Sequence, residues 1–203
     1  MKRKILKISF ILSGFLLWGC YPDGPEYVED MDVVFTSHNE SYDFASKATY
    51  AMPDKIVKIT GNVSEGEAPE FVPDATAKLI LDRIASNMTS LGWTKVAIGS
   101  DPDLLLEPAS LEVTTVYYWY DYWYWWYYPY YPYWGYNPVS YSSYTTGTLL
   151  MTLIDPKDLS ANGNPIKEWV GGGNGILTGS FNSSRIYGAI DKAFELSPYL
   201  NTK

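Results

Sequence analysis

The sequence predicts an α+β domain, in which one antiparallel β-sheet carries two α-helices on one face and an aromatic-rich hairpin projects from it. Two observations define this class. Apolar residues recur at helical spacing in only two stretches, 74–91 and 184–196, whereas apolar residues between them alternate with a period of two. In addition, 46% of the 203 residues are hydrophobic and 19% are charged, which excludes global disorder and fits one domain plus a processed end.

The amino terminus has the pattern of a secretory signal peptide. Basic residues at positions 2–4 and 7 precede an apolar run over 8–18, which is shorter than the roughly 20 residues that span a bilayer. The run ends Leu17-Trp18-Gly19-Cys20, which resembles the lipobox of bacterial lipoproteins. That resemblance implies cleavage before Cys20 and covalent diacylglyceryl and N-acyl modification at this residue. The alternative is a buried core cysteine behind an ordinary signal peptide.

We therefore divide the chain into a cleaved signal peptide (1–19), the lipidated Cys20 with an acidic tether (20–31) and a single α+β domain (32–203). Cleavage removes four basic residues and leaves 11 basic against 23 acidic ones, a net charge of −12. Such a chain repels nucleic acid, and a lipid anchor holds it at a membrane without a spanning helix. Tyr21 carries no inner-membrane retention signal under the enterobacterial sorting rule, which favours the outer membrane. The leaflet, facing the periplasm or the cell surface, stays open.

The elements follow from spacing and from start and stop signals. Short strands are expected over 32–36 and 48–52. The first helix, 74–91, begins at Pro73 and ends at Gly92; its inward face comprises Ala77, Ile80, Leu81, Ile84, Met88 and Leu91. The second helix, 184–196, is expected to be capped by Ser183 or Ser184. Further strands are expected over 111–116, 148–154, 167–170 and 176–178, and the glycine run 171–175 between the last two is expected to be a flexible turn or bulge.

Several motifs occur in an order that resembles a known family. They are Asp43-Phe44 with Lys47 to Ala51, Leu91-Gly92-Trp93, Asp101 to Leu106, Gly147 to Asp155, Glu168 to Gly171 and the terminal helix. Together they resemble the bacterial lipoprotein family that contains domain of unknown function 4136, over roughly residues 32–200. The resemblance implies the fold and an envelope location, and it supplies no activity and no catalytic residues.

Four candidates for a chemical site each have a simpler explanation. His38, the only histidine, lies in a polar stretch typical of a solvated loop, and no nucleophile elbow accompanies it. The glycine run 171–175 lacks the Lys-Ser/Thr pair of a phosphate loop. Residues 158–164 match positions 1, 3, 5, 6 and 7 of an EF-hand loop, but Trp169 stands at position 12, where a carboxylate is required, so we expect a hairpin turn at Asn162-Gly163. The pair Asp101 and Asp103 is interrupted by a proline and is expected in a loop that enters a strand.

The most unusual feature is residues 117–136, in which 16 of 20 residues are Tyr or Trp. We expect a hairpin over 117–138, and three explanations for it stay open. Its rings can pack over the sheet as a satellite core, form a contact surface for an envelope protein or the membrane interface, or stack on glycans with Asp121 as a polar partner. The candidate binding surface comprises Trp119, Trp123, Trp125, Trp126, Tyr128, Tyr131 and Trp134.

These observations predict a non-enzymatic, lipid-anchored protein of the cell envelope, in which the aromatic hairpin mediates association with a protein or the membrane interface. The alternative is a glycan-binding envelope lipoprotein. We expect no cofactor beyond the lipid at Cys20, no metal site and no nucleic-acid partner.

Overall fold

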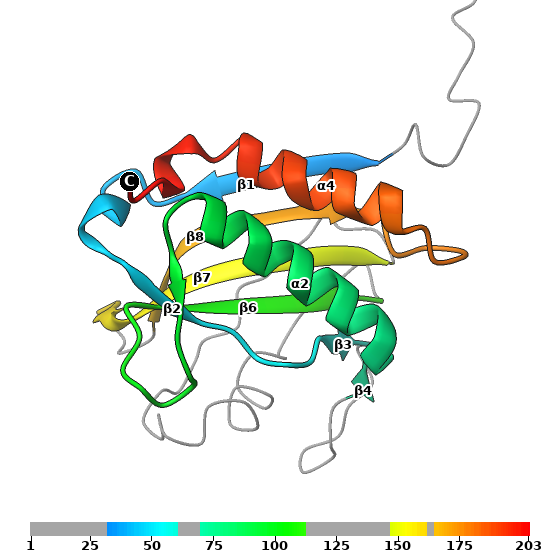
Figure 1. The fold of residues 1–203 in the computed structure, drawn as a ribbon, viewed down its shortest axis with the longest axis horizontal. Helices are drawn as coiled ribbons and strands as arrows, with labels where there is room; N and C mark the ends of the chain where they lie inside the picture. The colour runs from blue at the N-terminus through cyan, green and yellow to red at the C-terminus, as the bar shows by residue number, and fades with distance from the viewer. Residues whose placement is uncertain (1–31, 61–69, 113–146, 162–164) are drawn as a thin grey trace, which may run out of the picture. The chain divides into compact units, whose positions relative to one another are not determined.

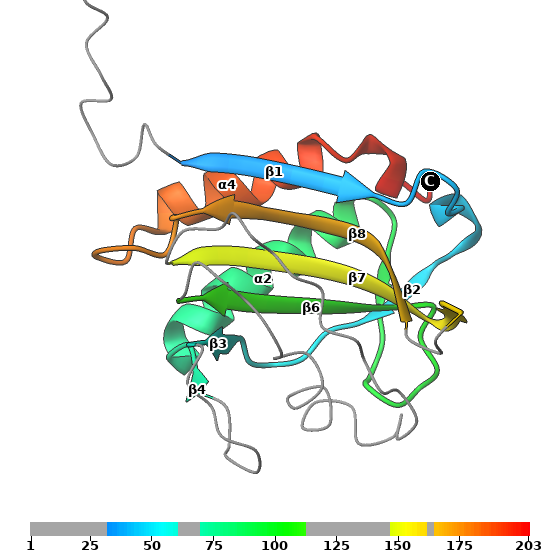
Figure 2. The ribbon, with the colours of Figure 1, turned by 180° about the vertical axis from the view of Figure 1, so that it is seen from behind.

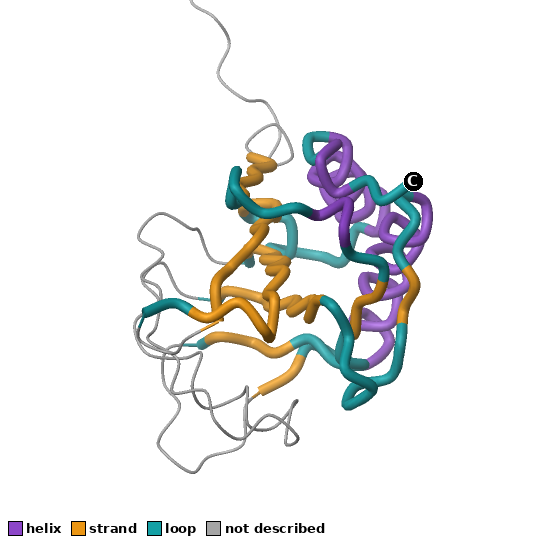
Figure 3. Tube along the Cα trace, turned by 90° about the vertical axis from the view of Figure 1, so that its left-hand side faces the viewer, coloured by secondary structure: helices purple, strands orange, loops and turns teal. Residues whose placement is uncertain are grey.

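A computed structural model describes residues 32–60, 70–112, 147–161 and 165–203, and residues 32–203 form one compact unit. The expected class is confirmed: a single sheet is covered on one face by two helices (Figure 1). Viewed from the other side, the strands lie in front and both helices lie behind them (Figure 2). The side view in Figure 3 shows the same two layers, with the helices on one side only.

The sheet is mixed, so the prediction of a purely antiparallel sheet is wrong. Its strands are β1 (Val33–His38), β2 (Thr49–Ala51), β3 (Val57–Ile59), β4 (Glu70–Phe71), β5 (Thr94–Lys95), β6 (Leu104–Leu111), β7 (Thr148–Leu159) and β8 (Pro165–Asn174). The order β1-β8-β7-β6 is antiparallel, whereas β6 pairs parallel with β2 and β3, and β2 pairs parallel with β5. Parallel pairs need a crossover, and the first helix supplies it between β2–β4 and β5–β6.

The two expected helices are present as α2 (Asp74–Ser90) and α4 (Ser183–Glu195). Two short 3-10 helices also occur, η3 (Phe44–Ser46) between β1 and β2 and η4 (Pro198–Leu200) after α4. The predicted inward residues of α2 pack in the core, and Gly92 adopts the left-handed φ of 102° that a helix-ending glycine favours. The predicted cap of α4 is wrong by one residue. Asn182 caps this helix, because its side chain accepts a hydrogen bond from the Arg185 backbone N–H.

The core lies between the sheet and the helices. In β7, Leu149, Met151 and Leu153 point into it, as their spacing predicts. From β8, the fully buried Trp169 stacks on Phe194 of α4, and its ring N–H donates to Ser197 Oγ over 2.8 Å. The indole therefore joins the sheet to the end of the second helix.

The glycine run is not a flexible turn, because Gly171, Gly172 and Gly173 lie inside β8. A Cβ atom on Gly171 would lie 2.3 Å from the Trp169 ring, and one on Gly172 would lie 2.2 Å from the Leu149 carbonyl oxygen. The Trp169 indole leaves no space for a side chain at Gly171, and the neighbouring strand β7 leaves none at Gly172. Likewise, the expected strand over 176–178 is a turn, and β6 ends at Leu111 while residues 113–116 lie outside the described residues.

None of the helices in the described part of the chain is both long and apolar enough to cross a membrane.

Candidate functional site

The site residues predicted from the sequence lie outside the described residues. This holds for Cys20, for the hairpin 117–138 and for its candidate surface Trp119, Trp123, Trp125, Trp126, Tyr128, Tyr131 and Trp134. The turn expected at Asn162-Gly163 is also outside them. Within the described ranges, no cluster of three or more metal-ligating side chains occurs.

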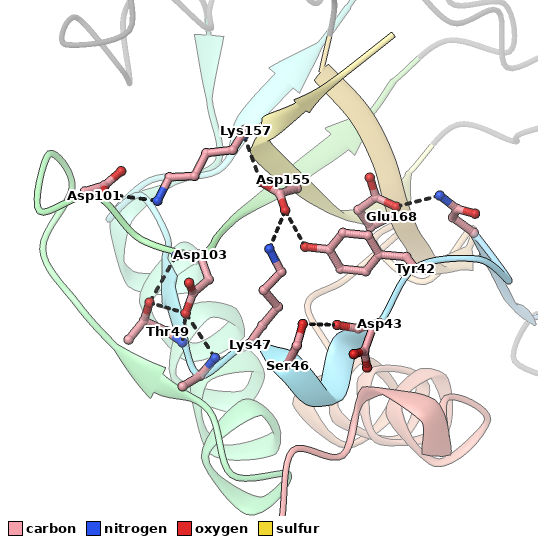
Figure 4. A network of polar contacts seen from close by, with 12 residues as sticks. Tyr42, Asp43, Ser46, Lys47, Thr49, Asp101, Asp103, Asp155, Lys157 and Glu168 are labelled. Carbon is pink, nitrogen blue, oxygen red and sulfur yellow. Dashed lines mark hydrogen bonds and ion pairs between the residues drawn. The ribbon is translucent and has the colours of Figure 1, made fainter.

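The described residues contain one prominent polar network, at the end of the sheet where β6 begins (Figure 4). We define it by its side chains: Asn39, Tyr42, Lys47, Thr49, Asp103, Asp155 and Glu168. Asn39, Tyr42 and Lys47 come from the chain that links β1 to β2, and Thr49 is the first residue of β2. Asp103 directly precedes β6, Asp155 lies in β7 and Glu168 lies in β8. The network therefore ties one loop to three central strands.

Asp155 is the centre of the polar network. Its Oδ2 accepts from the Tyr42 hydroxyl over 2.6 Å and from Lys47 Nζ over 2.8 Å, and its Oδ1 accepts from the Lys157 backbone N–H over 2.8 Å. Burial alone would raise the pKa of this carboxyl, but these donors outweigh it and hold the pKa below its usual value. Burial and the bond to Asp155 raise the Tyr42 pKa far above the ordinary value, so this phenol stays protonated.

Asp103 fixes the start of β2 beside the start of β6. One carboxylate oxygen accepts from the backbone N–H groups of Ala48 and Thr49 over 3.0 and 2.9 Å and from Thr49 Oγ1 over 2.8 Å. In return, the Asp103 backbone N–H donates to Thr49 Oγ1 over 3.0 Å. Although burial opposes it, this set of donors lowers the pKa of Asp103. The prediction that Asp103 enters a strand from a loop is confirmed.

Glu168 differs from the other two carboxylates of the polar network. It is fully buried; its Oε2 accepts from Asn39 Nδ2 over 2.9 Å, and its Oε1 has no hydrogen-bond partner among the described residues. Burial raises its pKa to about 7, although the Asn39 bond opposes the shift. Glu168 is therefore the carboxyl group of the network whose pKa is raised, whereas the pKa values of Asp103 and Asp155 are lowered.

The hydrogen bonds of the polar network join its members to one another and to nearby backbone groups. Asp155 and Asp103 each accept three hydrogen bonds, and the raised pKa of Tyr42 keeps its proton on the hydroxyl that donates to Asp155. Such an arrangement holds strands in register. We interpret the polar network as structural.

His38 does not lie in a solvated loop, so that prediction is wrong. It is the last residue of β1 and is half-buried, and its ring stacks on Tyr199 of η4 with 3.6 Å between the ring centroids. The stacking joins the first strand to the carboxyl-terminal segment. A packing role therefore explains the only histidine.

A small cavity of about 180 Å³ lies at the opposite end of β6. Its apolar lining includes Val72, Ile176 and Phe181, and its polar lining includes Lys58 and Glu112. This volume accommodates a side chain or a few water molecules and is smaller than the 300–1,000 Å³ typical of small-molecule sites. The cavity alone does not define a ligand.

The polar network was not predicted as a unit, although several of its members lie in the motifs that carry the family resemblance. Lys47, Asp103, Asp155 and Glu168 each belong to a different one of those motifs, and the fold brings them to one end of the sheet. A usable signal was Asp155, which directly follows a continuous apolar run in a predicted strand.

The fold and the polar network define a class of protein: an α+β domain whose buried polar groups lock a loop onto the sheet. The family model for the domain of unknown function DUF4136 matches residues 34–199, and the chain belongs to this family. A search of curated proteins finds no significant match.

Two solved structures are similar to this chain to different degrees. A DUF4136 family protein from Bacteroides thetaiotaomicron is 24% identical, with a TM-score of 0.61 over 85% of this chain and 98% of that one. The PelC dodecamer protein from Paraburkholderia phytofirmans is 16% identical, with a TM-score of 0.42 over 85% of this chain and 100% of that one. The first likeness supports the fold, and the second carries no further conclusion.

Proposed function

We propose that this chain is a non-enzymatic, lipid-anchored protein of the bacterial outer membrane, and that its Tyr/Trp-rich segment mediates association with another envelope protein or with the membrane interface. The observation that carries the proposal is the sequence of residues 117–136, in which 16 of 20 residues are Tyr or Trp. Tyrosine and tryptophan are enriched at protein interfaces and at membrane–water interfaces, because each has a large apolar ring and a polar group.

The position of this segment in the chain supports the proposal. It connects β6 and β7, the two central strands that pair over seven residues from Leu105–Ile154 to Leu111–Thr148. Strands paired in this way form a rigid base, and binding segments are commonly carried between such elements. The lipobox-like residues 17–20 place the expected anchor only about a dozen residues before the domain begins.

The experiment compares two triple variants of the chain from residue 21 onward. Trp123, Trp125 and Trp126 are changed together to Ser in one variant and to Tyr in the matched control. Association predicts that the Ser variant loses flotation with outer-membrane-like liposomes or cross-linking to envelope proteins, whereas the Tyr variant keeps it. Equal behaviour of both variants and the unchanged chain in every binding assay would refute the proposal.

The second candidate function is glycan binding, which is favoured by Asp121 among the rings, because a carboxylate beside flat rings suits sugar hydroxyls. A sugar site predicts saturable binding of one peptidoglycan fragment that fails on single Trp substitutions. An association surface tolerates each single Trp-to-Tyr exchange, so the same variants separate the two functions.

A further inference from the structure

The two helices cover one face of the sheet, and the opposite face of β6 and β7 is as buried as the core. Side chains that alternate with the core residues of β6 and β7 point to this helix-free face: Leu105, Glu107, Ala109, Leu111, Leu150, Thr152 and Ile154. Each of them is at most 1% exposed. No helix of the described ranges lies on this face (Figure 3), so another segment or molecule must exclude water there.

The connection between β6 and β7 begins and ends at the same end of the sheet. Leu111 and Thr148 are paired across the two strands, although 36 residues separate them in sequence. A hairpin needs only two to five residues for such a connection. A stretch such as 117–128 reaches ~40 Å when extended, whereas the eight residues of β6 span ~27 Å. The connection is therefore long enough to run along the helix-free face and return.

The chemistry of the helix-free face also matches this connection. The face is formed mainly by aliphatic side chains, with Glu107 in its centre. Neither carboxylate oxygen of Glu107 has a hydrogen-bond partner among the described residues. Burial raises its pKa to about 8, although Lys167 on β8 opposes the shift. A buried carboxyl group without donors is costly, and residues 113–146 hold 13 tyrosines and five tryptophans that could supply them.

We propose that residues 113–146 dock on the helix-free face, with one row of aromatic rings against Leu105, Ala109 and Ile154 and a Tyr hydroxyl or Trp ring N–H donating to Glu107. The rings on the opposite side of the segment stay available for association. This docking does not depend on what those outer rings bind, so it can hold even if the proposed association is wrong.

Cysteine labelling tests the proposal, because the chain from residue 21 onward has no native cysteine. Ala109→Cys places a small thiol in the helix-free face, and Ser37→Cys places one at an exposed position of edge strand β1. We expect maleimide to label Ala109→Cys at least ~100-fold more slowly than Ser37→Cys, because the reagent reaches Ala109→Cys only when the structure opens locally. Replacing residues 113–146 with an Asn-Gly turn should then bring the two rates within about tenfold of one another.

Cross-linking in the intact chain provides a second test in case the shortened chain does not fold. A cysteine is placed in turn at each of residues 117–128 and combined with Ala109→Cys, or with Lys78→Cys on the exposed surface of α2 as a control. Docking predicts intrachain disulfides with Ala109→Cys at some positions and none with Lys78→Cys. Three results would overturn it: fast labelling of Ala109→Cys, protection that appears only as protein concentration rises, or cross-links only between chains. The second and third results would identify a second copy as the occupant.

Discussion

The Asp155→Asn substitution tests whether the polar network stabilises the sheet end. The Asp155 side chain is 3% exposed and that of Lys47 is 24% exposed, so their 2.8 Å ion pair is largely screened from water. Asparagine keeps the size and one acceptor oxygen but removes the charge. Breaking a fully buried pair costs about 3–5 kcal/mol, and the partial exposure of Lys47 reduces this to about 2–4 kcal/mol. For a domain of this size, the melting temperature should fall by about 6–12 °C.

The pH dependence gives a separate check. Because Asp155 has a folded-state pKa below its usual value, its contribution is fully present above the unfolded-state pKa of about 3.9 and is lost as the pH falls below it. Urea unfolding at pH 7 and at pH 3 should therefore show a stability difference between the unchanged chain and the variant that shrinks at the lower pH.

Matched variants isolate the ion pair from general damage. Asp82→Asn removes the partner of Lys78, in a pair whose side chains are 63% and 74% exposed, and should change stability by less than about 0.5 kcal/mol. A double-mutant cycle with Lys47→Met should give a coupling of at least about 1 kcal/mol. If Asp155→Asn costs no more than the Asp82 control, or if its cost is the same at pH 3, the interpretation of the network is wrong.

Three further predictions concern the sheet and the anchor. Gly171→Ala should lower the free energy of unfolding in urea by about 1–3 kcal/mol, because its Cβ would meet the Trp169 ring. Gly188→Ala in α4 is the control and should be neutral or stabilising, because a Cβ there meets nothing within 4 Å. Equal effects of the two variants would contradict the packing argument. Because the Glu107 pKa is raised, the free energy of unfolding of the unchanged chain should fall as the pH rises from about 4.3 to the folded-state pKa of about 8. Glu107→Gln should remove this fall, so the variant is more stable than the unchanged chain at about pH 8.5 but not at about pH 5. Parallel pH profiles of the two proteins would contradict this prediction. Cys20→Ser should abolish incorporation of labelled palmitate in bacteria and partition into detergent, and retained labelling would exclude the proposed anchor.

The helices could be predicted from the sequence because their stabilising contacts are periodic. In α2, residues such as Ala77, Ile80 and Ile84 recur at spacings of three and four and are buried. Caps were less predictable, since Asn182, Ser183 and Ser184 are adjacent and each can accept the capping bond. Only the geometry of the chain before α4 selects Asn182.

The strand pairing could not be read from local patterns. Whether β2 and β3 run parallel or antiparallel to β6 depends on how α2 crosses the sheet, which no residue of the strands encodes. The glycines of β8 were misinterpreted for a similar reason. Gly171 makes room for Trp169, two residues before it on the same face, and glycine runs are otherwise typical of turns.

The polar network required the tertiary structure, because its members come from segments that are more than 50 residues apart in sequence. Asp155 bonds with Tyr42 and Lys47, and Asp103 bonds with Thr49. The sequence does indicate that Asp155 and Glu168 are unusual, since each adjoins strongly apolar residues. It does not indicate which partners neutralise them.

Tryptophan emission tests the central claim, that the Tyr/Trp-rich segment is the association surface, most directly. Five of the seven tryptophans in residues 21–203 lie in the segment, and the other two, Trp93 and Trp169, are at most 2% exposed in the core. The chain from residue 21 onward is titrated with outer-membrane-like liposomes, with envelope extract and with peptidoglycan fragments. We expect a saturable blue shift with liposomes or extract, which the Trp-to-Ser triple variant loses. An emission spectrum that none of the three changes would contradict it, and a response to peptidoglycan alone would favour glycan binding instead.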